Sequence, residues 1–185
     1  MGKRLFVSVD LEGLDEGVAD VQDRFDGTPG LNLTEPEQAH VTLKFLGDVS
    51  DHRLDEVTDA LDDAVAAAGV DPFTAEFAGL GVFPTLDYIS VVWLGVEDGS
   101  DELTRLHEAV EPRLVELGFE EESHEFTPHV TLARMEHAGG KERVQKLVRE
   151  CHPEAGTMEV SEVRLTESEL TADGPEYTTV ERFEL

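Results

Sequence analysis

The tetrapeptide His-Val-Thr-Leu occurs twice in this 185-residue chain, at His40–Leu43 and again at His129–Leu132. Successive side chains of a β-strand point to opposite faces. As a strand, each copy would therefore turn its imidazole and hydroxyl to one face and its two aliphatic side chains to the other. One copy alone would carry little weight. Two identical copies, 89 residues apart, predict a single site that uses both.

Two histidines and two threonines in one small volume favour chemistry at a phosphate. Imidazoles with an ordinary pKa of about 6.5 can hold opposite protonation states near neutral pH, so one accepts a proton while the other donates one. The hydroxyls of Thr42 and Thr131 can donate to phosphate oxygens, and Lys44 or an arginine can balance the developing charge. We expect no cofactor. A metal site using both histidines is the alternative, disfavoured because the spacing is neither HxH nor HExxH and no carboxylate lies on either histidine face.

The elements that must position these residues can be predicted from hydrophobic patterns. Apolar side chains at three- and four-residue steps predict helices over residues 54–68, 100–117 and 144–151, with a weaker signal over 14–25. Apolar runs rich in β-branched residues predict seven strands. These are Leu5–Val9, Val41–Leu46, Phe73–Phe83, Tyr88–Val96, Val130–Met135, Met158–Leu165 and Tyr177–Phe183.

Alternating strands mixed with helices and short connections favour an α+β fold with largely antiparallel sheets and the helices outside. Each tetrapeptide begins the same succession of strand, turn and helix. We therefore predict a duplicated unit within one domain spanning residues 1–185. Its two lobes, each with its own sheet and one His-x-Thr motif, would be related by an approximate two-fold axis and would face each other across a central cleft.

The acidity of the chain is extreme. There are 42 Asp and Glu against 14 Lys and Arg, giving a formal net charge of −28. Such charge repels itself in dilute buffer and is screened at about 1 M salt, where the Debye length falls to about 3 Å. Acidity spread over helix faces is typical of proteins from salt-loving organisms. A single cysteine, Cys151, excludes an internal disulfide, and no apolar run approaches a membrane span. We predict a cytoplasmic, monomeric protein.

Other aromatic side chains need separate interpretation. Phe6 and Phe126 are candidates for a base pocket if they face the cleft. The remaining five histidines are predicted to be solvated or capping residues, and only the one nearest the second motif, His124, is a further candidate for the site. These five are His52, His107, His124, His137 and His152.

Several stretches around the repeated motif match a known pattern. They are RLFVSVDL at Arg4–Leu11, HVTLKFLGDV at His40–Val49, GLGVFP at Gly79–Pro84, VVWLGV at Val91–Val96 and FTPHVTLAR at Phe126–Arg134. With them the chain resembles the 2H phosphoesterase superfamily, named for its two His-x-Thr motifs. Within that superfamily it is similar to the RNA 2′,3′-cyclic phosphodiesterases, also called 2′-5′ RNA ligases. The resemblance covers essentially the whole chain.

The resemblance implies a hydrolase that opens a ribose 2′,3′-cyclic phosphate and leaves a 2′-phosphate. It implies His40 as proton donor to the leaving 3′ oxygen and His129 as proton acceptor from water. The family also uses an arginine five residues after the second histidine, which is Arg134 here. Because that offset is odd, strict alternation would turn Arg134 away from His129. A bulge near Ala133, or the long arginine stem, would bring it back.

The expected partner is RNA with a 2′,3′-cyclic phosphate end, with tRNA fragments among the candidates. A strongly acidic protein gives up long-range attraction for phosphates, so recognition would be local to the RNA end. Two alternatives stay open. One is a phosphodiesterase for small cyclic nucleotides such as ADP-ribose cyclic phosphate. The other is a 2′-5′ RNA ligase or an RNA-end binding module in tRNA processing.

Overall fold

The structure, a computed structural model, describes residues 2–185 as four α-helices and nine strands with three short 3-10 helices. The α-helices are α1 (Asp15–Asp23), α2 (Leu54–Ala68), α3 (Ser100–Glu116) and α4 (Lys141–Glu150). The strands are β1 (Gly2–Asp10), β2 (Leu31–Leu33), β3 (His40–Ser50), β4 (Phe73–Pro84), β5 (Ile89–Val96), β6 (His129–Met135), β7 (Glu154–Val160), β8 (Glu162–Thr171) and β9 (Gly174–Glu184). The 3-10 helices are Pro36–Gln38, Asp51–Arg53 and Ala138–Gly140.

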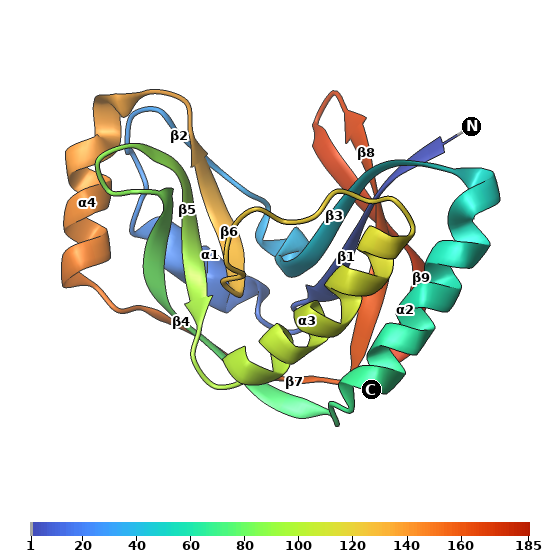
Figure 1. Ribbon diagram of the computed structural model, residues 1–185. Coiled ribbons are helices and arrows are strands. Elements are labelled where there is room, and N and C mark those ends of the chain that lie inside the picture. The colour runs from blue at the N-terminus through green and yellow to red at the C-terminus, as the bar shows by residue number, and fades with distance from the viewer. Residues whose placement is uncertain (1) are drawn as a thin grey trace.

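All nine strands belong to one antiparallel sheet, which curls around the middle of the molecule (Figure 1). The strand order is β7-β4-β5-β6-β3-β1-β8-β9, and β2 pairs with β6. The α+β class is confirmed, but the prediction of two sheets is wrong. The two halves join where β3 meets β6, through the single residue pair Val41 and Val130. Alternation within strands is the same in one sheet or two, so the sequence does not reveal this junction.

The helices cover the sheet in two pairs. α2 packs on α3, and α3 lies against β3, whereas α1 contacts β7 and α4 contacts β4. The predicted apolar stripe of α2 is buried, and the helix ends at Gly69 with a left-handed φ of 61°. Such a φ favours glycine, which has no Cβ to clash. Within residues 2–185, no helix has the length and apolarity needed to cross a membrane.

The predicted strand Met158–Leu165 is in fact parts of two strands. The chain leaves β7 at Ser161 and enters β8 at the following residue. β7 pairs with β4 in one half of the sheet, and β8 pairs with β1 in the other. Two consecutive polar residues, Ser161 and Glu162, break the apolar alternation at this crossing, and the predicted strand ran across that short break. The three-residue strand β2 was also missed, because so short a segment has no readable period.

Candidate active site

The two HVTL segments lie next to each other at the centre of the sheet. Val41 pairs with Val130 in antiparallel register, and both valines are fully buried. That register places His40 across from Thr131, and His129 across from Thr42. All four of these polar side chains are half-buried. The structure thus brings together the two histidines and two threonines that the sequence predicted for one site.

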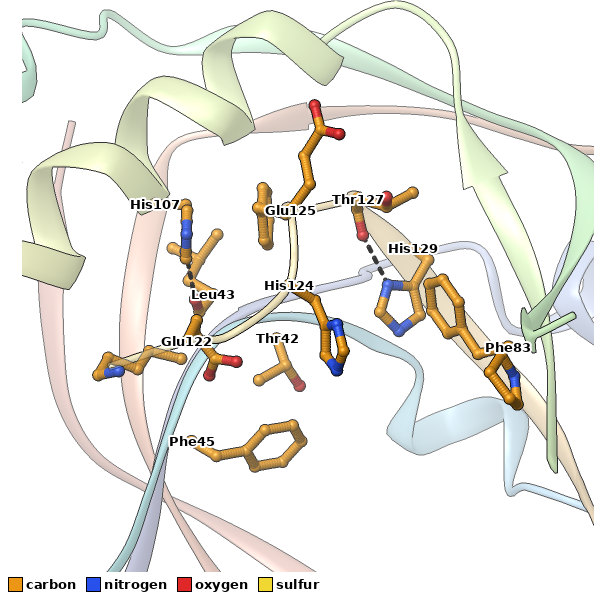
Figure 2. A pocket seen from close by; sticks show the side chains of 13 residues that line it. Thr42, Leu43, Phe45, Phe83, His107, Glu122, His124, Glu125, Thr127 and His129 are labelled. Atoms are coloured by element: carbon orange, nitrogen blue, oxygen red, sulfur yellow. Dashed lines mark hydrogen bonds between the residues drawn. The ribbon is translucent and has the colours of Figure 1, made fainter. Parts of the chain in front are cut away.

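Both imidazoles are held by the same backbone contact. Nδ1 of His40 lies 2.9 Å from the carbonyl oxygen of Gln38, and Nδ1 of His129 lies 2.7 Å from that of Thr127. A carbonyl oxygen only accepts, so Nδ1–H donates in each case. In the neutral ring this leaves the lone pair on Nε2. Figure 2 shows His129 with this bond on one edge and its other edge turned into a pocket.

Aromatic rings from other strands of the sheet lie against each histidine. The ring of His40 lies 5.0 Å from Phe6 and 5.3 Å from Tyr177, between centroids. The ring of His129 lies 4.8 Å from Phe83 and 5.9 Å from Trp93. Burying an imidazole disfavours its charged form, and this is the largest cause of the lowered pKa of both histidines. The bonded carbonyl oxygens oppose the effect in both.

The nearby charges differ between the two histidines. The carboxylate of Asp10 raises the pKa of His40, while the positive charge of Arg134 lowers it. For His129, both nearby charges, His40 and Arg134, lower the pKa. The two rings are therefore alike in position and in hydrogen bonding, but only one of them has a nearby carboxylate that favours its protonated form.

A register shift explains why Arg134 faces the site. Thr131 pairs with Trp93 and Ala133 pairs with Val92, so Leu132 falls out of the register with β5. The shift acts as a β-bulge, which turns two consecutive side chains inward and sends the next one back to the histidine face. Arg134 is accordingly exposed, and its charge reaches both histidines and Tyr177. The bulge lies one residue before the expected position.

The same shift in β3 overturns the expected position of Lys44. Leu43 falls out of the register with β1, so Lys44 turns into the core. Although it lines the cavity described next, its Nζ is engaged 2.9 Å from Oε2 of Glu111 and 2.7 Å from the carbonyl oxygen of Glu120. Phe45 occupies the histidine face instead and is 64% exposed. Lys44 is thus not among the groups gathered at the two motifs.

A cavity of about 480 Å³ opens beside His129 and Thr42, beneath the segment that links α3 to β6. Phe45, Phe83 and Phe126 provide its aromatic walls. Figure 2 shows the ring of His124 reaching into the cavity from that segment. The site therefore combines an apolar, base-sized space with hydrogen-bonding groups at one end. Of the two phenylalanines predicted for a base pocket, Phe126 lines this cavity, whereas Phe6 packs on His40.

The linking segment is tied to β3 by buried polar groups. The Glu111 carboxylate receives Lys44 and also the backbone N–H of Glu122 at 2.9 Å. Burial alone would raise the pKa of Glu111, but these two donors hold it below its usual value. His107 donates from Nδ1 to the carbonyl of Leu43 at 2.8 Å and stacks on Phe126. The prediction of a solvated or capping His107 is wrong, because the residue is only 8% exposed and its ring anchors the linking segment to β3.

Sequence reasoning missed Asp10 and Tyr177, which contact or influence His40 from β1 and β9. The only available signal for Asp10 was its place at the end of an alternating strand, one step beyond Phe6 and Ser8 on the same face. Among residues 2–185, no group of three or more His, Cys, Asp or Glu is arranged to hold a metal ion.

The geometry is matched by similarity to known proteins. The chain is 38% identical over 188 residues to the RNA 2′,3′-cyclic phosphodiesterase of Methanothermobacter thermautotrophicus, with both proteins covered in full. It is 42% identical over 155 residues to that of Aeropyrum pernix, covering 83% of this chain and 85% of the relative.

Solved structures share the fold. TT0787 of Thermus thermophilus superposes with a TM-score of 0.81 at 27% identity, over 98% of this chain and 97% of the other. Escherichia coli LigT complexed with 3′-AMP gives 0.82 at 23% identity, over 100% and 99%, a likeness of fold alone. The model of the 2′-5′ RNA ligase superfamily matches residues 14–171. The resemblance seen in the sequence is confirmed, and the chain belongs to the 2′-5′ RNA ligase superfamily.

Proposed function

We propose that this protein hydrolyses the 2′,3′-cyclic phosphate at RNA ends and leaves a 2′-phosphate, with His40 as proton donor and His129 as proton acceptor. The observation that carries the proposal is the pair of histidines anchored identically through Nδ1, which leaves both Nε2 atoms for one substrate. Relatives named RNA 2′,3′-cyclic phosphodiesterase, 38% and 42% identical to this chain, support the same reaction.

The reaction needs two proton transfers and one displacement at phosphorus. Nε2 of neutral His129 accepts a proton from water as the water oxygen bonds to phosphorus. The bond from phosphorus to O3′ breaks, and Nε2 of protonated His40 gives its proton to O3′. The products are a 2′-phosphomonoester and a free 3′-hydroxyl. His129 then loses its proton to solvent and His40 regains one.

Charge that builds on the phosphoryl oxygens meets fixed donors. The hydroxyls of Thr42 and Thr131 lie on the histidine face, and the Arg134 guanidinium is directed there by its bulge. Among residues 2–185, no carboxylate lies within ion-pair distance of Arg134, so its charge is available to the substrate. Preorganised donors of this kind stabilise the transition state more than the ground state.

The terminal nucleoside fits the cavity beside His129. The volume of the cavity, about 480 Å³, falls in the range of sites that hold small ligands. The rings of Phe45 and Phe126 offer surfaces on which a base can stack, and such stacking tolerates all four bases. The net charge of −28 repels the rest of an RNA at low salt, which favours recognition confined to the end.

The test is turnover of an oligonucleotide ending in a 2′,3′-cyclic phosphate, in 1 M KCl with EDTA, where the Debye length is about 3 Å. We expect the 2′-phosphate as product, and a loss of about 100-fold or more in kcat/KM for His40→Ala and for His129→Ala. The exposed His52 provides the matched control, because His52→Ala should leave turnover unchanged. Full activity in either active-site variant would overturn the two-histidine mechanism, and inhibition by EDTA would favour a metal instead.

The same assay separates the alternatives. Added RNA with a 5′-hydroxyl would replace water as the nucleophile in a ligase, giving a 2′-5′ phosphodiester, and the superfamily description makes this the second candidate. Faster turnover of ADP-ribose cyclic phosphate than of the oligonucleotide would identify a small-molecule enzyme. Tight binding of the RNA end without turnover would identify a binding module.

A further inference from the structure

The strands that flank the two motifs supply different neighbours to the two histidines. On β1, Asp10 is the residue directly opposite His40. On β5, Gly95 is the residue directly opposite His129. Side chains directly opposite each other in an antiparallel pair share one face, with Cβ atoms about 5 Å apart. One histidine therefore has a carboxylate beside it, and the other has no side chain at all in that place.

The carboxylate of Asp10 is fixed in position. Its Oδ1 accepts from Oγ of Ser8 at 2.8 Å, and its Oδ2 accepts from Nη1 of Arg164 at 2.9 Å. The same guanidinium also donates to the carboxylates of Glu12 and Glu162, and Arg182 donates to Glu162 as well. Arg164 is thus shared among three carboxylates, so it does not neutralise Asp10 alone, and Asp10 is the member of the cluster whose charge acts on His40.

The backbone prevents a matching carboxylate beside His129. A Cβ built on Gly95 would lie 2.9 Å from the carbonyl oxygen of Ala78, closer than real Cβ atoms approach such a group. The ring of Trp93 closes the space from another side, at 3.4 Å. A side chain at position 95 would require the backbone of β4 to move. The difference between the two histidines is therefore built into the packing of the strands.

We propose that Asp10 is the positioning residue that assigns the two histidines their opposite proton-transfer roles, by placing on the His40 side a negative charge that has no counterpart beside His129. This inference rests on the proposed function and concerns how the same site is set up. Asp10 acts through His40, with its own oxygens held by Ser8 and Arg164, and it is not expected to touch the phosphate.

The other charged groups around His40 do not provide this bias. Arg134 from β6 lowers the pKa of His40 and that of His129 alike. Tyr177 from β9 has a pKa raised by burial, so its phenol is neutral in the working range. Asp10 is the carboxylate among residues 2–185 whose charge raises the pKa of His40. It favours a protonated donor at His40 while His129 stays a neutral acceptor.

The test is the pH dependence of kcat/KM for Asp10→Asn. The acid limb of a bell-shaped profile reports the proton acceptor and the alkaline limb reports the donor. Removing a nearby negative charge should move the alkaline limb down by about 0.5–1 pH unit and leave the acid limb in place. Asp10→Glu should restore the wild-type profile. The matched control is Glu12→Gln, which takes a negative charge from the same cluster at a more exposed position and should move neither limb.

Several results would overturn the inference. Unmoved limbs, with or without lower activity, would reduce Asp10 to a structural residue. Movement of the acid limb instead would make His40 the acceptor. Should Asp10→Asn fail to fold, Arg164→Gln decides, because removing the positive partner of Asp10 must move the alkaline limb upward and leave the acid limb in place. Simple loosening would hydrate both imidazoles, whose pKa values are lowered by burial, and would move both limbs upward. The proposed function fails separately, through full activity of the His40→Ala or His129→Ala variant in the turnover assay.

Discussion

The strands β3 and β6 carry the same tetrapeptide, the same register shift and the same histidine anchor, yet they differ in the residues that follow the shift and in the residues that pair with the two histidines. Leu43 and Leu132 both fall out of register. The next two residues are Lys44-Phe45 on β3 and Ala133-Arg134 on β6. One motif therefore sends a cation into the core and an aromatic ring into the cleft, while the other buries a methyl group and presents a guanidinium.

The comparison separates two tasks within one site. The shared features place two imidazoles and two hydroxyls symmetrically about the Val41 and Val130 pair. In the proposed reaction the differing features give each strand its own task, since β3 would supply a ring for the nucleoside and β6 would supply a charge for the phosphate. Under the proposed mechanism, Asp10 and Gly95 would extend the difference to the proton transfers. Each of these differences can be tested by substituting a residue in one strand and comparing the effect with that of substituting its counterpart in the other strand.

The largest expected effect is on stability. It concerns Lys44, which follows the bulge of β3 at the position that Ala133 occupies on β6. Lys44→Met would leave the half-buried Glu111 carboxylate without its cationic partner, so we expect a loss of about 3 kcal/mol in the free energy of unfolding. Denaturant unfolding in high KCl measures it. Because folding holds the pKa of Glu111 below its unfolded value, the contribution is present at neutral pH and declines as the pH falls through the acid range.

A double variant provides the control for the buried pair. Lys44→Met with Glu111→Leu removes both charges and should recover much of the lost stability, since an apolar pair often replaces a buried ion pair without cost. If Lys44→Met instead kept full stability and weakened substrate binding, Lys44 would be a phosphate ligand after all, and the two motifs would be more alike than the structure indicates.

The second expected effect separates Arg134 from Phe45, which occupy equivalent positions after the two bulges. Arg134→Met should lower kcat/KM about 100-fold, mainly through kcat, because the guanidinium meets charge that develops in the transition state. Phe45→Ala should act mainly through KM, by about 10-fold, because stacking holds substrate and transition state alike. Steady-state kinetics on a cyclic-phosphate dinucleotide measures both. If the loss in kcat/KM were split between kcat and KM in the same proportion in both variants, separate roles for Arg134 and Phe45 would be contradicted.

The smallest effect tests what the motifs share. Thr42→Val and Thr131→Val each remove one hydroxyl without changing the shape of the side chain, and each should cost about 10-fold in kcat/KM, the size of one hydrogen bond to a charged group. The two losses should agree closely, because the hydroxyls are placed equivalently. A silent change at one position beside a large loss at the other would show that the phosphate is not held symmetrically.

Much of the fold and of the site could be predicted, because the alternation of side chains between the two faces of a strand depends only on neighbouring residues. It correctly put His40 with Thr42, and His129 with Thr131, on one half-buried face. The helix spacing correctly predicted α2 and its end at Gly69. Identity of the two motifs predicted that they would meet. These inferences depend only on neighbouring residues, which the sequence presents directly.

The rest depends on register, which alternation does not contain. The bulge at Leu43 turns Lys44 into the core, until a second register shift at Leu46 restores the alternation, so Lys44 was placed on the wrong face. The bulge at Leu132 returns Arg134 to the histidine face in the same way. The position of Asp10 opposite His40 requires knowing that β1 pairs with β3 and where the pairing starts. Likewise, the joining of two halves through the Val41 and Val130 pair is a contact between residues 89 apart, with no local signature.

The central claim is that identical side chains perform opposite proton transfers, and a substrate with sulfur in place of the 3′ oxygen tests it most directly. A thiolate leaves without being protonated, so His40→Ala should lose less than about 10-fold on this substrate while losing about 100-fold or more on the oxygen parent. His129→Ala should lose the same large factor on both, because water must still be deprotonated. Equal losses for His40→Ala on the two substrates, or rescue of His129→Ala by sulfur, would contradict the assignment.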